Sequence, residues 1–258
     1  MGGREEREAE ALKNIERFAD RVRELIRGIT LDKLLEEGGL NPYMVAALGV
    51  DDIRDLVRFF VYKRAERSLG TSFGNVIEAF LRDLLGGKSG KDADPACRGR
   101  GRRGSQGTPW VCWWDIVVEG DFERGGKRYR GVVISVKSGP ADINKDIIET
   151  FLRHAAEAEA NGYRPYLVLT YGKRAFTVAE STLRGAGVDP REVLLVGRDV
   201  FREFFGDPGY YDRVIDLMRS AARKVDVFRL IEEKVDELTA ELKGRFGGDI
   251  SEILKRLS

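Results

Sequence analysis

Two neighbouring segments of the chain, residues 110–118 and 129–137, have the composition of buried β-strands. Both are rich in valine, isoleucine and aromatic residues, and a glycine-containing turn separates them, which is typical of an antiparallel hairpin. A helix is predicted next over 145–160, followed by an apolar strand over 166–170. This order of elements predicts an α/β fold with a mixed central sheet flanked by helices.

The chain on either side of this central part is predicted to be helical. Residues 4–28 carry apolar side chains at helical spacing. A longer helix over 51–68 is expected to end at Gly70, with another helix beginning directly after it. We therefore expect a helical N-terminal region, an α/β core and a helical C-terminal region, over residues 1–70, 71–206 and 207–258.

The charge of the whole chain shows no general affinity for nucleic acid. Lysine and arginine total 44 against 43 aspartate and glutamate residues, which leaves a formal charge of +1. Residues 88–109 differ, because six basic residues there face two acidic ones, a net charge of +4. This segment is either a solvated surface loop or a contact for phosphate groups through Arg98, Arg100, Arg102 and Arg103.

Apolar runs, cysteines and amides indicate the environment of the protein. The longest uncharged run is far shorter than the about 20 apolar residues of a transmembrane helix, and no signal peptide is visible, so we expect a cytoplasmic protein without a membrane partner. Cys97 and Cys112 match no zinc spacing and argue against a disulfide framework. One glutamine, five asparagines and 34% charged residues are typical of a thermophile protein, or of an arginine-rich genome.

The two predicted strands of the hairpin carry a carboxylate and an amine in otherwise apolar surroundings. In an antiparallel hairpin Asp115 and Lys137 fall toward the same end of the sheet, and Ser135 shares a face with Lys137. Such charges are costly to bury without a partner or a metal ion. The pair is therefore either a structural ion pair or part of a site.

Two glutamates on predicted helices are candidates to join this pair. Glu149 flanks the apolar stripe of the helix over 145–160, but it could equally form a surface ion pair with Lys145 or Arg153. Glu78 borders the stripe of the helix before the hairpin, and its alternative is a surface position beside Arg82. His154, the only histidine, is interpreted as structural.

These residues together resemble the PD-(D/E)XK nuclease superfamily. The resemblance is strongest to type II restriction endonucleases, including EcoRII-like and archaeal members, in which serine replaces the usual second acid and a glutamate on the next helix supplies it. It covers about residues 72–171, and Trp114 rather than proline precedes the first acid. The matching residues are Asp115, the segment Ser135-Val136-Lys137-Ser138-Gly139-Pro140, and Glu149.

The resemblance implies a restriction-endonuclease-like core and a Mg²⁺-dependent enzyme that hydrolyses phosphodiester bonds at a short specific site in double-stranded DNA. It implies catalytic roles for Asp115, Ser135, Lys137 and Glu149, and Mg²⁺ ligands at Asp115, Glu149 and Glu78. Contacts to DNA are expected from the four arginines of residues 98–103, and from Asn144 and Lys145.

A near-symmetric DNA site favours a homodimer, because a two-fold protein matches a two-fold site. A DNA methyltransferase is the expected genetic partner. Two alternatives remain open. One is a structure-specific or repair nuclease of the Holliday-junction-resolvase kind. The other is a non-catalytic DNA-binding protein in which Asp115 and Lys137 form a structural pair.

Overall fold

The structure is a computed structural model and describes residues 4–35, 40–97, 108–173, 178–223, 225–247 and 249–256. The chain divides into two compact units. Unit 1 comprises Met1–Ile15 and Gly74–Leu217, and unit 2 comprises Glu16–Phe73 and Met218–Ser258. Unit 2 therefore combines residues from both of the helical regions that the sequence predicts at the two ends.

Unit 1 is built on a four-stranded mixed sheet with the strand order β1-β2-β3-β4. Strands β1 (Ile116–Arg124) and β2 (Lys127–Lys137) are antiparallel. Strands β3 (Tyr163–Leu169) and β4 (Leu194–Val196) follow in parallel, β3 beside β2 and β4 beside β3. The predicted α/β class with a mixed sheet flanked by helices is confirmed.

Helices make the connections between the parallel strands, because a parallel pair cannot be joined by a tight turn. The helix predicted over 145–160 is confirmed at these bounds, since Asn144 caps its first turn and the chain turns at Asn161. The helices of this part are α6 (Lys145–Ala160), α7 (Val178–Gly185), α8 (Pro190–Val193), α9 (Arg198–Phe205) and α10 (Tyr210–Ala222).

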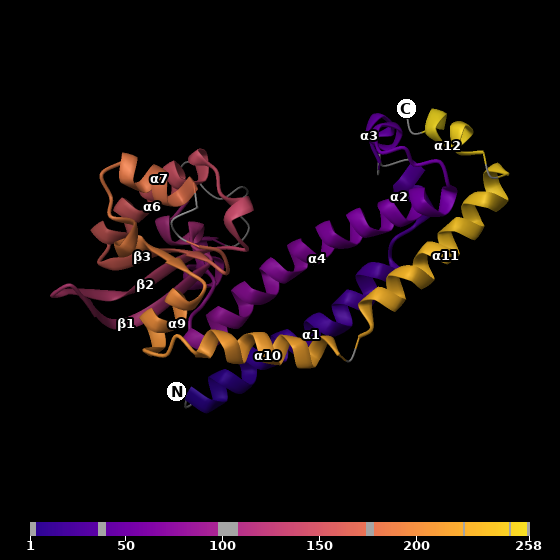
Figure 1. Cartoon of the computed structure of the whole chain (residues 1–258). Helices are drawn as coiled ribbons and strands as arrows, with labels where there is room; N and C mark the ends of the chain where they lie inside the picture. Colours follow the sequence, from indigo (N-terminus) through magenta and orange to yellow (C-terminus); the bar gives the residue numbers. More distant parts are fainter. Residues whose placement is uncertain are drawn as a thin grey trace. The chain divides into compact units, whose positions relative to one another are not determined.

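Each face of the sheet is covered by different helices (Figure 1). On one face Val133 packs in a buried cluster with Phe151 of α6 and Leu183 of α7. On the other face the ring of Tyr166 meets Phe204 of α9, with ring centroids 5.5 Å apart. Successive side chains of a strand point to opposite faces. Ser135 and Lys137 therefore share the face of Val133, the face that α6 and α7 cover.

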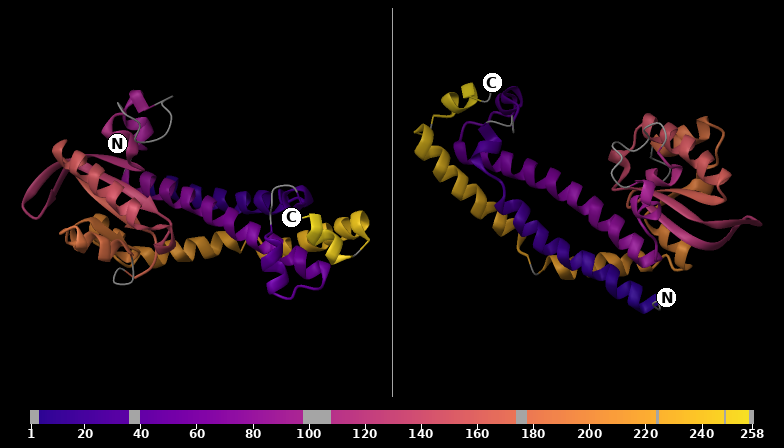
Figure 2. Two further views of the ribbon diagram at one scale, coloured as in Figure 1. Left: turned by 90° about the horizontal axis from the view of Figure 1, so that it is seen from above. Right: turned by 180° about the vertical axis from the view of Figure 1, so that it is seen from behind.

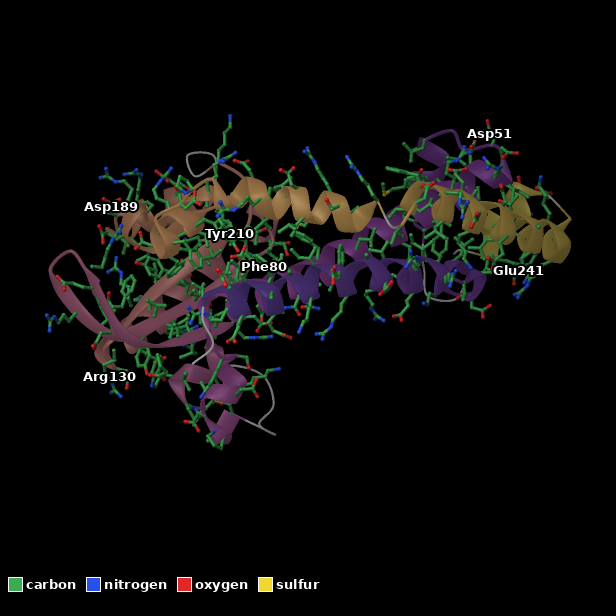
Figure 3. All side chains as sticks on the ribbon, turned by 90° about the horizontal axis from the view of Figure 1, so that it is seen from below. Asp51, Phe80, Arg130, Asp189, Tyr210 and Glu241 are labelled. Carbon is green, nitrogen blue, oxygen red and sulfur yellow. A yellow bond between two sulfur atoms is a disulfide. The ribbon has the colours of Figure 1, made fainter. Side chains whose placement is uncertain are left out.

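The β1–β2 hairpin extends beyond the rest of the sheet (Figure 2), because β2 pairs with β3 only from Gly131 onward. Gly125 and Gly126 form its turn with positive φ angles of 58° and 74°, which glycine adopts without strain. Figure 3 shows Arg130 of this hairpin at the surface and Phe80 inside unit 1.

Unit 2 is helical over its described ranges. The guanidinium of Arg54 on α4 (Ile53–Leu85) lies 2.9 Å from carboxylate oxygens of Glu232 and Asp236 on α11 (Val227–Phe246). None of the helices that the structure describes is long and apolar enough to cross a bilayer. The helices that contribute to this unit are α1 (Arg4–Arg27), α2 (Leu31–Leu35), α3 (Pro42–Ala47), α4 (Ile53–Leu85), α10, α11 (Val227–Phe246) and α12 (Ile250–Arg256).

The prediction that a helix ends at Gly70 is wrong, because α4 continues through it from Ile53 to Leu85. Glycine inside a helix costs only about 1 kcal/mol relative to alanine. Buried side chains on each side of it, among them Phe60 and Phe80, stabilise the helix by more than that. Tertiary packing therefore overrides the local propensity.

The prediction that a strand begins at residue 110 is also wrong. Trp110–Trp113 form a 3₁₀ turn, η2, and β1 begins only at Ile116. Neighbouring residues of a strand point to opposite faces. Here the rings of Trp113 and Trp114 both pack on Phe151, with ring centroids 6.4 Å and 5.9 Å from its own. Packing both rings against α6 is incompatible with an extended backbone here.

The expectation that the two cysteines argue against a disulfide is corrected by the structure. Cys97 and Cys112 form a disulfide, with their Cα atoms 5.5 Å apart. Cys97 ends a 3₁₀ turn, η1 (Pro95–Cys97), and Cys112 lies in η2. The helix α5 (Gly90–Ala93) contacts both turns and brings them together, which no spacing in the sequence reveals.

Candidate active site at the end of the β1–β2 hairpin

A carboxylate and an amine meet at the end of the β1–β2 hairpin, as the sequence predicts. Ile116 pairs with Ile134, and the backbone N–H of Asp115 donates to the Ile134 carbonyl at 3.0 Å. The Nζ atom of Lys137 lies 3.8 Å from Oδ2 of Asp115. The predicted register of the hairpin therefore holds at this end of the sheet.

The carboxylate of Asp115 is held in place by the strand beside it. The residue is 4% exposed. Its Oδ2 atom accepts hydrogen bonds from the Val136 N–H at 2.8 Å and from the Ser135 hydroxyl at 3.3 Å. These hydrogen bonds compensate for the cost of burying the charged carboxylate, and they fix its orientation.

Lys137 is the more accessible member of the pair. Its side chain keeps 26% of its surface exposed, whereas that of Asp115 keeps 5%. The ammonium donates to the Ser135 hydroxyl at 3.3 Å and to the Val136 carbonyl at 3.2 Å. The Ser135 hydroxyl therefore connects the two charges. A positive group with one side open to solvent can meet an anionic ligand that approaches this end of the sheet.

The chain after β2 turns sharply into α6. Gly139 donates its N–H to the carboxylate of Asp142 at 3.2 Å in a short 3₁₀ turn, η3 (Pro140–Asp142). Asn144, predicted to contact nucleic acid, is the N-cap of α6, and its Oδ1 accepts the Ile147 N–H at 2.9 Å. The Asn144 side chain therefore caps α6, which is a structural role.

The structure does not bring Glu149 together with Asp115. Glu149 is 58% exposed and pairs with Lys145 at 3.5 Å, and both line a groove with Ser181 and Thr182 of α7. The α7 helix precedes β4, at the sheet edge opposite β1. The tryptophans next to β1 contact Phe151 and His154 instead, on another side of α6. Glu149 therefore lies on the side of α6 that turns away from Asp115.

Glu78 is on the part of α4 that passes this end of the sheet. A Cβ atom added to Gly74 would stand 2.6 Å from the Ser138 hydroxyl, so this turn of α4 touches the residue after β2. A Cβ atom on Gly87, two residues after the end of α4, would stand 2.9 Å from Ile116, so the chain that leaves α4 reaches β1. Glu78 lies on α4 one helical turn beyond Gly74, between these two contacts.

The carboxylates at this end of the sheet fit a Mg²⁺ ion only if water molecules complete its coordination shell. Within the described ranges, no three histidine, cysteine, aspartate or glutamate side chains gather to hold a metal ion. Mg²⁺ commonly uses one or two carboxylates and completes its shell with waters and substrate phosphates. Asp115 fits as one such carboxylate.

Other predicted residues fall outside this cluster. Arg98, Arg100, Arg102 and Arg103 lie outside the residues that the structure describes. His154 stacks on Trp113, with centroids 4.6 Å apart, and its Nδ1 atom lies 3.0 Å from a carboxylate oxygen of Glu157. These contacts agree with the interpretation of His154 as structural.

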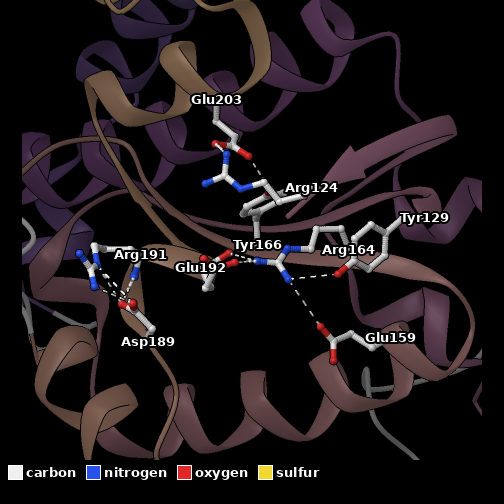
Figure 4. Close-up of polar contacts among 9 residues, drawn as sticks. All are labelled: Arg124, Tyr129, Glu159, Arg164, Tyr166, Asp189, Arg191, Glu192 and Glu203. Atoms are coloured by element: carbon white, nitrogen blue, oxygen red, sulfur yellow. Dashed lines mark hydrogen bonds and ion pairs between the residues drawn. The ribbon is translucent and has the colours of Figure 1, made fainter. Parts of the chain in front are cut away.

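A second polar cluster, which the sequence reasoning missed, surrounds Arg164 at the other end of the sheet (Figure 4). Its guanidinium donates to the backbone carbonyl of Glu192 at 2.6 Å and to the carboxylate of the same residue at 2.7 Å. It also donates to the Tyr129 hydroxyl at 3.3 Å and lies 5.7 Å from the centroid of the Tyr166 ring. Arg164 lies two positions before the predicted strand over 166–170, and no pattern in the sequence marked it.

Two tyrosine hydroxyls of β3 are fixed as neutral donors. Tyr163 donates to the Glu119 carboxylate at 2.7 Å, and Tyr166 to the Glu203 carboxylate at 2.6 Å. Burial, together with the hydrogen bond to Glu119, raises the pKa of Tyr163 to about 12. Burial and Glu203 raise the pKa of Tyr166 further. Neither hydroxyl can therefore act as a base near neutral pH.

We expect Arg164→Met to lower the free energy of unfolding by about 2–4 kcal/mol, because it removes charge-assisted hydrogen bonds from a buried position. Urea unfolding followed by circular dichroism measures the change. Arg191→Met is the matched control, since Arg191 pairs with Asp189 at 2.9 Å on the surface and its loss should change little. Equal midpoints for the two variants would contradict a structural role for the Arg164 cluster.

Comparison with known proteins adds no family assignment. No protein-family model matches the sequence, and no curated protein matches it.

Proposed function

We propose that the protein is a Mg²⁺-dependent type II restriction endonuclease that hydrolyses phosphodiester bonds at a short specific site in double-stranded DNA. The observation that carries this proposal is the pair at the end of the hairpin. A buried Asp115 carboxylate is oriented by the Val136 N–H, and a partly exposed Lys137 ammonium lies 3.8 Å from it. The resemblance of residues 135–140 to restriction endonuclease active sites supports the same function.

In this proposal each side chain of the cluster has a defined task. Asp115 would hold the metal ion, with Glu78 as the second carboxylate. A bound Mg²⁺ supplies neutralisation of phosphate charge and a more acidic water. Lys137 would place its ammonium beside the scissile phosphate, where negative charge develops. Ser135 keeps both groups in position through its hydroxyl.

Double-stranded DNA and a second copy of the chain are the proposed partners, with a DNA methyltransferase encoded nearby. The proposed contacts to DNA phosphates come from four arginines that precede Asp115 closely in the sequence: Arg98, Arg100, Arg102 and Arg103. Lys145 is exposed at the start of α6 and is available for the same purpose, although it pairs with Glu149. DNA as the substrate implies a cytoplasmic location.

Digestion of phage DNA tests the proposal directly. We expect discrete fragments with Mg²⁺, none with chelator, and higher activity at elevated temperature, because few amides and dense charge are typical of thermophile proteins. A smear of products would favour a nonspecific or repair nuclease, and selective cutting of four-way junctions would favour a resolvase. DNA binding without any cleavage in Mg²⁺ or Mn²⁺ would favour a non-catalytic DNA-binding protein.

A further inference from the structure

The disulfide lies close in sequence to the candidate active site. Cys112 precedes Asp115 by three residues, and its partner Cys97 is 15 positions earlier in the chain. Both cysteines are buried, with 7% of Cys97 and 4% of Cys112 exposed. The bond therefore joins the segment that enters β1 to the turn that follows α5.

The segment between Pro109 and Asp115 has little regular backbone pairing of its own. It forms η2 rather than a strand, so no ladder ties it to β2 before Asp115. The Gly90 N–H donates to the Trp114 carbonyl at 3.1 Å. A Cβ atom at Gly90 would collide with the carbonyls of Val111 and Trp114, so α5 lies directly against the η2 backbone. The disulfide adds a covalent tie to this contact.

Asp115 lies two residues after the end of η2. Its carboxylate must reach the Val136 N–H at 2.8 Å, at the point where the hairpin ladder ends. On the side of Asp115 toward the N-terminus, the chain is held by the rings of Trp113 and Trp114 on α6, by the Gly90 contact and by Cys112. Loss of the covalent tie would leave η2 held only by noncovalent contacts.

We propose that the Cys97–Cys112 disulfide is a redox-sensitive clamp that holds η2, and with it Asp115, in the arrangement seen here. A dithiol reductant would transfer two electrons and two protons to the disulfide. The S–S bond breaks, two thiols form, and the reductant becomes a disulfide. The reduced protein keeps the sheet but loosens the segment that carries Asp115, so stability and site geometry both depend on the redox state.

The three tryptophans provide a readout that does not depend on any activity. Trp110, Trp113 and Trp114 are the only tryptophans in the chain, and each lies within two residues of Cys112. Intrinsic tryptophan fluorescence therefore reports on this segment alone. We expect reduction to shift the emission to longer wavelength, because the rings become more exposed to water. We also expect it to lower Tm by about 6–12 °C.

The experiment compares oxidised protein, protein fully reduced with dithiothreitol, and a Cys97→Ser/Cys112→Ser variant. Alkylation and mass spectrometry should find no free thiol before reduction and two after it. The serine variant should match the reduced protein in fluorescence and Tm and should ignore reductant. Two alkylated thiols in native protein, or identical fluorescence and Tm in both redox states, would overturn the proposal.

The activity measurement rests on the proposed function and is therefore kept separate. We expect the reduced protein to cleave DNA about 10- to 100-fold more slowly, the penalty of a displaced catalytic group. Cleavage at equal rates in both states would refute the link between the clamp and Asp115. If neither state cleaves DNA, the nuclease proposal fails, while fluorescence and Tm still test the clamp.

Discussion

Asp115→Asn and Lys137→Ala should each lower DNA cleavage by about 10³-fold or more while leaving DNA binding largely unchanged. Removing one preorganised charge-stabilising group typically costs 10²- to 10³-fold, and the loss of a metal-binding carboxylate adds to it. Binding should persist, because these two groups serve the transition state rather than groove contacts. Single-turnover cleavage in Mg²⁺ and DNA binding in Ca²⁺ measure the two effects.

Asparagine is chosen at residue 115 because its amide oxygen can still accept the Val136 N–H, which keeps the buried contact. Asp146→Asn is the matched control, since Asp146 is an exposed carboxylate in the first turn of α6. Binding that falls in parallel with cleavage in both variants would contradict the assignment. Cleavage at the wild-type rate by Asp115→Asn, with reduced stability, would mean that the pair is structural.

Glu78→Gln should lower cleavage by at least about 10-fold and raise the Mg²⁺ concentration needed for half-maximal rate, whereas Glu149→Gln should have little effect. The reason is geometric. The contact between Gly74 and Ser138 brings α4 to the end of β2, and Glu78 is one helical turn further along. Glu149 instead pairs with Lys145 beside α7. Cleavage measured across a Mg²⁺ titration separates the two glutamates.

The sequence resemblance ranks these glutamates in the opposite order, so the comparison is informative in either direction. A large loss in Glu149→Gln with normal activity in Glu78→Gln would mean that the second acid comes from α6. In that case Glu149 must leave Lys145 and turn toward β1 when DNA binds. Similar small losses in both, equal to that of Asp146→Asn, would leave Asp115 as the only carboxylate of the site.

The elements that could be predicted are those whose signal is local. The α6 helix was found at its bounds, because Asn144 caps it and its apolar stripe has the period of a helix. The proximity of Asp115 and Lys137 was found as well. An antiparallel hairpin places the start of one strand beside the end of the other, whatever surrounds it.

The elements that could not be predicted depend on contacts between residues far apart in the chain. The cysteines pair because α5 holds two short turns together, and η2 is not a strand because two neighbouring tryptophans both pack on α6. The Arg164 cluster likewise joins β3 to α8 through Glu192.

By itself the sequence determined the α/β class, the mixed sheet and the sheet end that carries Asp115 and Lys137, because period-two and period-3.6 patterns are properties of the local chain. Only the tertiary structure decided which neighbours Glu149 faces. Helical spacing leaves Glu149 at the border of its apolar stripe and does not say toward which neighbour it turns. The packing of α7 against one side of α6, and of the tryptophans against another, settles that direction.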